Sequence, residues 1–244
     1  MAPNIKLNLK TKPSSPTLVV GFPGFGLVGV IATEFLCNHT DAVEIGKYWF
    51  EGLPATVAVH EGKIVNPVGI FFDKKNNLVI IHSISSAPGL EWSASELILE
   101  VANKVGAKEI ICMDGVGISG NTAAPTGSRI FFYAQDKKSK ERLEAAAIKP
   151  EALKESIIMG VTPAILLKSE VPVVAIFSEV KSDLPDSKAA AKLIQTLNEY
   201  LKMNLNYKPL IEAGEKFEEK IKKMVDEHKK ITDNATKKDL DYFG

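Results

Sequence analysis

Six residues near the amino terminus have the spacing of a nucleotide-binding motif. Residues 24–29 read Gly-Phe-Gly-Leu-Val-Gly, a G-x-G-x-x-G pattern that follows an apolar, β-branched run and opens a predicted helix. In dinucleotide-binding enzymes the first glycine ends the strand, so that the helix N-terminus faces the pyrophosphate. Here Gly21 and Pro23 intervene, and neither Glu44 nor Glu51 is placed where an acid would hold the ribose.

We therefore interpret the glycine cluster as structural. Gly21 and Gly24 permit a tight turn from strand to helix, whereas Gly26 and Gly29 let the helix approach the sheet or a neighbouring subunit closely. Exposed backbone amides at this turn would still suit an anion.

Two loops form the best candidate for a small-molecule pocket. Residues 82–96 carry polar side chains just beyond a predicted strand, and Asp114 comes at the end of another. Because α/β sheets bind ligands beyond the carboxyl ends of their strands, Ser85 and Asp114 would line the pocket of an enzyme that acts on a nucleoside-like or phosphorylated ligand. A helix cap at Ser93 or Ser95 explains much of the polar run without chemistry.

The sequence has no motif of nucleophilic or metal catalysis. Residues 117–120, Gly-Ile-Ser-Gly, miss the nucleophile elbow G-x-S-x-G by one residue, and there is no P-loop. The four histidines are scattered without the spacing of metal ligands. We therefore predict no catalytic residue, no metal and no cofactor.

The composition predicts a globular protein without a bias toward polyanions. Of the 244 residues, 45% are hydrophobic, and 30 Lys and Arg balance 30 Asp and Glu, which argues against nucleic-acid and membrane partners. Cys37 and Cys112 lie in apolar surroundings without CxxC spacing, as expected of reduced thiols in a cytoplasmic protein. No segment has the build of a signal peptide or a membrane span. Abundant Lys and Glu with only two Gln fit a thermophilic source.

Strand-like and helical segments alternate along residues 1–206, which we predict to form one α/β domain. Continuous apolar strands between helices indicate a mainly parallel sheet covered on both faces, a three-layer α/β/α sandwich. Residues 68–73 and 78–84 flank the turn Lys-Lys-Asn-Asn and predict an antiparallel hairpin. The other predicted strands cover 17–22, 42–50, 109–117, 128–134 and 172–177, and the main helices cover 26–38, 91–105 and 186–203.

Residues 207–244 differ from the α/β domain in their residue pattern and predict a C-terminal helical extension with a flexible tail. Apolar or small residues recur at 4-3-4-3 spacing from Leu210 and include Phe217, Ile221 and Met224, between residues dense in Glu and Lys. This narrow stripe fits a helix that lies on its own domain or one that projects and packs on another subunit. The chain ends in the adjacent aromatics Tyr242 and Phe243, followed by Gly244.

Taken in order, several segments resemble the archaeal branch of the proteasome assembly chaperone family, of the second-chaperone type. They are "GFPGFGLVGVIATEFL", "EGLPA", "DGVG", "GVTPAILL" and "LPDSKAAAKLI", and the resemblance covers about residues 15 to 203. It implies a fold similar to the nucleoside phosphorylases, no established catalytic residues and a ring-forming homo-oligomer. On this resemblance the glycine cluster is an architectural signature.

The resemblance also implies a role for the end of the chain. Proteasome activators and some of these chaperones end in a hydrophobic residue, a tyrosine and any residue, and this terminus inserts between neighbouring α subunits of the core particle. Tyr242 matches the hydrophobic position and Gly244 supplies the carboxylate, but Phe243 stands where tyrosine is expected. Loss of one buried hydrogen bond costs about 1 kcal/mol. A ring of such tails would offset that loss through effective concentration.

The sequence therefore predicts a non-enzymatic, homo-oligomeric scaffold of the proteasome-assembly type. Phe217, Ile221 and Met224 would form a contact stripe, and residues 242–244 would dock on proteasome α subunits. A paralogous chaperone-like protein is the alternative partner, because the tail departs from the expected pattern. An enzyme with its pocket near Gly24, Ser85 and Asp114 is the second alternative.

Overall fold

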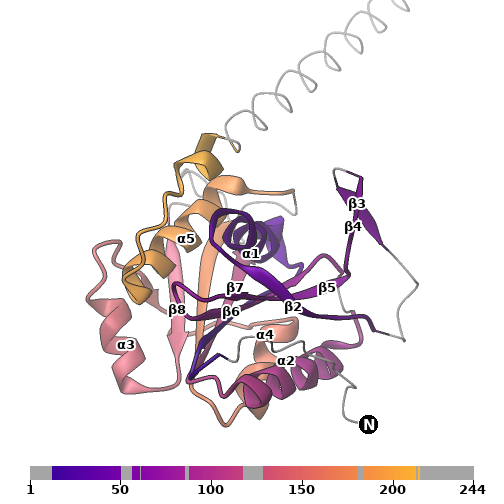
Figure 1. Ribbon diagram of the computed structural model, residues 1–244. Coiled ribbons are helices and arrows are strands. Elements are labelled where there is room, and N and C mark those ends of the chain that lie inside the picture. Colours follow the sequence, from indigo (N-terminus) through magenta and orange to yellow (C-terminus); the bar gives the residue numbers. More distant parts are fainter. Residues whose placement is uncertain are drawn as a thin grey trace, which may run out of the picture.

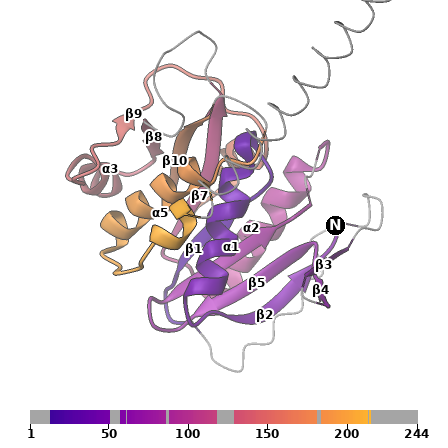
Figure 2. The same ribbon diagram turned by 90° about the horizontal axis from the view of Figure 1, so that it is seen from above.

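The computed structural model describes residues 13–50, 57–60, 62–85, 88–117, 129–180, 184–212 and 214. These residues form a three-layer α/β/α sandwich around an eight-stranded sheet, as predicted (Figures 1 and 2). The strand order is β2-β5-β6-β1-β7-β10-β8-β9. The strands are β1 Thr17–Gly21, β2 Val43–Tyr48, β5 Val68–Asp73, β6 Leu78–Ser83, β7 Glu109–Gly117, β8 Ile130–Ala134, β9 Glu151–Ala152 and β10 Val173–Val180.

The four central strands β6, β1, β7 and β10 run parallel, because their connections cross over through helices. Antiparallel pairing is confined to the outer strands, where β5 pairs with β2 and β6 and β8 pairs with β10. The predicted hairpin is therefore confirmed as β5 and β6. A second, two-stranded sheet consists of β3 (Ala58–His60) and β4 (Lys63–Val65).

Each face of the large sheet has its own helical layer and its own core. Helices α2 (Glu91–Val105) and α4 (Val161–Lys168) pack on one face. Helices α1 (Val28–His39) and α5 (Ser187–Leu201) cover the other, and α3 (Lys137–Glu144) contributes Leu143 there. The central strands are apolar on both sides, as sheets buried between two layers are.

The first residues of α5 agree with the sequence prediction, whereas the N-cap of α2 differs from it. Asp186 caps α5 by accepting a hydrogen bond from Ala189 N–H at 2.8 Å, in the segment predicted to open that helix. The expected cap at Ser93 or Ser95 is wrong, because α2 already begins at Glu91 with Leu90 as its N-cap residue. The Ser95 hydroxyl instead donates to the carbonyl of Trp92, one turn earlier.

Among the described residues, no helix is long and apolar enough to cross a bilayer.

The described part of the C-terminal extension packs on the domain. Residues 208–212 are helical, and Leu210 is buried in the hydrophobic core on the side of the sheet that α1 and α5 cover. A Cβ atom on Gly214 would lie 2.8 Å from Cβ of Ser187, at the start of α5. The first two positions of the predicted stripe thus contact the domain itself.

Candidate functional site

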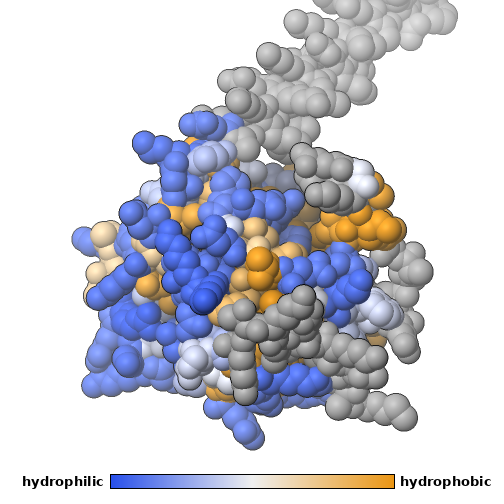
Figure 3. Space-filling model, viewed as in Figure 1, coloured by the Kyte–Doolittle hydropathy of each residue, from blue (hydrophilic) through white to orange (hydrophobic). Residues whose placement is uncertain are grey.

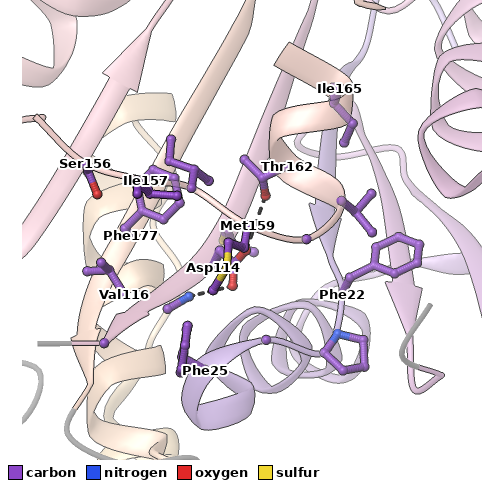
Figure 4. A pocket seen from close by; sticks show the side chains of 18 of the residues that line it. Phe22, Phe25, Asp114, Val116, Ser156, Ile157, Met159, Thr162, Ile165 and Phe177 are labelled. Atoms are coloured by element: carbon purple, nitrogen blue, oxygen red, sulfur yellow. Dashed lines mark hydrogen bonds between the residues drawn. The ribbon is translucent and has the colours of Figure 1, made fainter. Parts of the chain in front are cut away.

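A pocket of about 470 Å³ lies at the carboxyl ends of three parallel strands (Figure 4). Its floor comes from the ends of β1, β7 and β10, and its other walls come from residues 156–160 and the start of α4. Strand β7 continues along β10 to Gly117, whereas its pairing with β1 ends at Met113. This overhang presents Asp114 at the edge where parallel α/β sheets bind ligands.

The turn from β1 into α1, which contains the glycine cluster, forms one wall of this pocket through residues 22–25. Residues Phe25–Leu27 make one 3₁₀ turn, η1, in which Gly26 and Leu27 have φ of 61° and 50°. A side chain on Gly26 would meet Val180 of β10 at 2.6 Å, besides being strained at that φ. The Gly26 carbonyl accepts a hydrogen bond from Asp186 N–H at 2.9 Å, which ties this turn to the start of α5.

The other glycines of the cluster allow close backbone packing. A Cβ on Gly29 would overlap the carbonyl oxygen of Met113 in β7, and one on Gly21 would overlap the carbonyl oxygen of Gly29. A Cβ on Gly24 would overlap the Asp114 carboxylate. The space that a pyrophosphate would need in front of the first glycine therefore holds a carboxylate, and the arrangement opposes an anionic ligand.

Asp114 is the ionisable group among the described residues that line the pocket. Its Oδ1 accepts a hydrogen bond from Gly115 N–H at 2.7 Å, and its Oδ2 accepts one from the Thr162 hydroxyl at 3.3 Å. Desolvation by the surrounding apolar residues raises the pKa of Asp114 to about 6, although both hydrogen bonds act in the opposite direction. The side chain is thus mainly ionised at pH 7 in an apolar setting.

The rest of the lining is predominantly apolar and aromatic. Phe22 follows β1, Phe25 belongs to η1 and Phe177 belongs to β10, so that three separate segments bring phenylalanine to the pocket. Ile157 and Met159 stand at its rim with 88% and 66% of their surface exposed. Ser156 and Thr162 supply the hydroxyl groups.

The structure separates the two residues that the sequence placed in one pocket. Asp114 lies in the pocket beside Gly24, but Ser85, after β6, is not among the described residues that line it. Strand β1 stands between β6 and β7, which keeps the two loops apart. Sequence reasoning also missed the wall formed by residues 156–162. The helix start Gly160-Val161-Thr162-Pro163, where Gly160 has a φ of 93°, was the signal that a loop turns there beside the sheet.

The described residues do not assemble the side chains of familiar catalytic sites. No group of three or more His, Cys, Asp or Glu among them is arranged to hold a metal. His82 is buried away from the pocket lining, with Nδ1 3.0 Å from the Thr33 hydroxyl, and burial lowers its pKa to about 4. Cys112 is buried as well, and desolvation raises the pKa of its thiol. Such a thiol is a packing residue and a poor nucleophile.

The β3–β4 hairpin is a second surface of interest. Val59 and Ile64 are cross-strand partners with 69% and 71% of their surface exposed, and Val57 before β3 is exposed too. Hydrophobic surface appears at the position of this hairpin in the space-filling view (Figure 3). A two-stranded sheet has little stability of its own, so burial of its apolar face against another surface would stabilise the hairpin.

The predicted docking residues Phe217, Ile221, Met224, Tyr242, Phe243 and Gly244 lie outside the described residues.

Comparison with known proteins gives concordant matches. Residues 18–225 match the model of the PAC2 family. An uncharacterized protein of Methanocaldococcus jannaschii is 22% identical over 231 residues, with 93% of each chain covered. The structure resembles that of Pyrococcus furiosus PbaA, an archaeal homolog of proteasome-assembly chaperone, with a TM-score of 0.80, 25% identity and 97% of both chains covered. Pyrococcus furiosus PbaB, an archaeal proteasome activator, shares the fold with a TM-score of 0.75 at 19% identity, over 92% of this chain and 99% of that one.

Proposed function

This chain belongs to the PAC2 family, and on that premise we propose that it is a non-enzymatic, homo-oligomeric scaffold of the proteasome-assembly-chaperone type. The observation that carries the proposal is the likeness to PbaA, which extends over 97% of both chains with a TM-score of 0.80. The partner is a proteasome α subunit, and the C-terminal helix and tail are the docking element.

We divide the chain into a body, residues 1–206, and a C-terminal arm, residues 207–244. The packing of Leu210 and Gly214 against the body supports an arm that leaves from α5 at a fixed place. Such an arm would present Phe217, Ile221 and Met224 to a neighbour and carry Tyr242, Phe243 and Gly244 to the partner. Self-association through the body would multiply these weak contacts.

Native mass spectrometry of the protein with its cognate proteasome α subunits tests this function. We expect a mixed complex that disappears when residues 242–244 are deleted, while the homo-oligomer persists. The variant Phe243→Tyr restores the missing hydroxyl and should tighten the complex about fivefold, as expected for one hydrogen bond of about 1 kcal/mol. A mixed complex that survives the deletion would show that the tail is not the docking element.

The departure at Phe243 favours a second candidate, a scaffold that assembles with a paralogous chaperone-like protein. A homo-oligomer that binds no α subunit but forms a defined complex with a co-expressed paralogue would select this alternative. In that case the fold assignment stands and the proteasome partner is wrong.

A further inference from the structure

Asp114 gives the pocket a negative charge that no side chain of the described lining neutralises. It is the one ionisable residue among the described residues that line the pocket. Its two oxygens accept one hydrogen bond each within the described part of the chain, from Gly115 and Thr162. A carboxylate can accept about four hydrogen bonds, so about half of this capacity is open to a ligand.

The walls around this carboxylate suit the apolar part of a cationic ligand. Phe22, Phe25 and Phe177 come from three separate segments and lie on different sides of Asp114 (Figure 4). The faces of aromatic rings attract cations, and the interaction strengthens where water is excluded. Met159 and Ile157 extend the apolar surface to the rim. A ligand with a cationic head and an apolar body would therefore match both the charge and the walls.

We propose that this pocket binds an organic ammonium group, a protonated amine on an apolar or aromatic body, with the ammonium at Asp114 and the body against the phenylalanine and isoleucine walls. A phosphorylated ligand is disfavoured, because its negative charge would meet Asp114 in front of Gly24. The ammonium belongs to a free amine or to the lysine side chain of a bound protein. The proposal does not depend on the proteasome as a partner.

The charge of Asp114 at pH 7 supports this assignment. The pKa of Asp114 is raised to about 6 by desolvation, which leaves the carboxylate charged at pH 7. Burial, together with the charge of Asp114, raises the pKa of the nearby Cys112 thiol, so this thiol stays neutral at pH 7. Binding of an ammonium should therefore weaken as the pH falls below about 6, as Asp114 takes up a proton.

Calorimetric titration at pH 7.5 with three ligands of similar shape tests the proposal. We expect 2-phenylethylamine to bind at least tenfold more tightly than the neutral 2-phenylethanol, and 3-phenylpropionate not to bind. A mimic of a protein lysine, Nα-acetyl-lysine N-methylamide with a free ε-ammonium group, distinguishes the two sources of the ammonium. Tighter binding of the mimic would assign the pocket to a protein lysine, and tighter binding of the free amine would assign it to a small molecule.

Variants of the pocket separate the role of the charge from that of the shape. Asp114→Asn keeps an acceptor for Gly115 N–H and should weaken amine binding more than tenfold, whereas the exposed Glu170→Gln removes one charge elsewhere and should change nothing. Met159→Lys, at an exposed rim position, provides a competing ammonium on the protein and should also weaken binding. It tests the proposal even where Asp114→Asn fails to fold.

Three results would overturn the proposal. The first is that neither amine binds in the millimolar range, and the second is that the alcohol binds as tightly as the amine. The third is that Asp114→Asn and Glu170→Gln bind the amine equally tightly.

Discussion

Two ionisable residues, the half-buried Asp114 and the buried His82, respond to pH in opposite directions. Burial raises the pKa of Asp114 to about 6, so the folded state holds its proton more tightly than the unfolded state does. Burial lowers the pKa of His82 to about 4, so the folded state binds its proton less tightly. In the acidic range, Asp114 therefore favours folding as the pH falls and His82 opposes it. Single variants separate the two contributions.

We expect Asp114→Asn to stabilise the protein at pH 7.5 by about 1 to 3 kcal/mol, because the ionised carboxylate is held in an apolar pocket. Ionised Asp114 lowers the unfolding free energy of the wild-type protein above pH 6. This loss disappears as the pH falls toward 3.8, the ordinary pKa of an Asp side chain. The gain should therefore shrink between pH 6 and pH 4. Urea denaturation at several pH values measures it, and a pH-independent gain would contradict this account.

His82→Gln should have the opposite pH dependence. The wild-type protein loses stability as the pH falls from 6.5 to 4, since the unfolded His82 takes up a proton that the folded one does not. This loss amounts to about 3 kcal/mol at most. The variant lacks it, so the difference in unfolding free energy between the two proteins should narrow by pH 4.5. Equal slopes for both proteins would show that His82 is exposed in the native state.

At the scale of elements, the turn from β1 into α1 determines how closely the helix sits on the sheet. Gly29 occupies the first turn of α1 against the Met113 carbonyl, and Gly21 lies against the Gly29 carbonyl. Backbone contacts of this kind leave no volume for a methyl group. The same turn places Gly24 beside Asp114, so helix packing and pocket shape depend on one set of contacts.

Gly29→Ala tests the close approach of α1. Alanine is favoured over glycine within a helix by about 1 kcal/mol, which alone would predict stabilisation. Because the added Cβ would overlap Met113, we expect instead a loss of at least about 2 kcal/mol. The exposed Glu34→Ala on the same helix serves as the control and should change the unfolding free energy little. Equal stability of Gly29→Ala and the wild type would mean that α1 sits farther from β7.

At the scale of the whole molecule, the β3–β4 hairpin exposes apolar side chains that a second subunit could cover. Val59 and Ile64 on the β3–β4 hairpin face solvent as a cross-strand pair. If the protein self-associates through the hairpin, the double variant Val59→Lys, Ile64→Lys should lower the oligomer mass in native mass spectrometry. Leu167→Lys, at an exposed position on α4, is the matched control. An unchanged mass would place the subunit interface elsewhere.

The contact stripe of the arm is tested by Phe217→Asp combined with Ile221→Asp. Charged residues at these positions should disturb packing of the arm or assembly, which appears as a changed oligomer mass or a lower melting temperature. A variant that keeps both wild-type values would remove Phe217 and Ile221 from the interface.

The sequence by itself determined the order of elements, the three-layer fold and the family resemblance. Apolar runs with helical or alternating periodicity reflect burial of one local segment at a time, and they located α2 and β7 at their observed bounds. The N-cap of α2 was predicted at the wrong residue, because a serine inside the first turns of a helix resembles a cap in the sequence alone.

Only the tertiary structure decided which loops meet. Ser85 and Asp114 both follow strands, yet β1 separates those strands in the sheet, and Thr162 reaches Asp114 from a helix 48 residues farther along the chain. The pKa of Asp114 depends on apolar neighbours from four segments, which no local pattern reveals. Strand order and long-range packing are properties of the assembled sheet, and they are the physical reason why the pocket and its charge appear only in the folded chain.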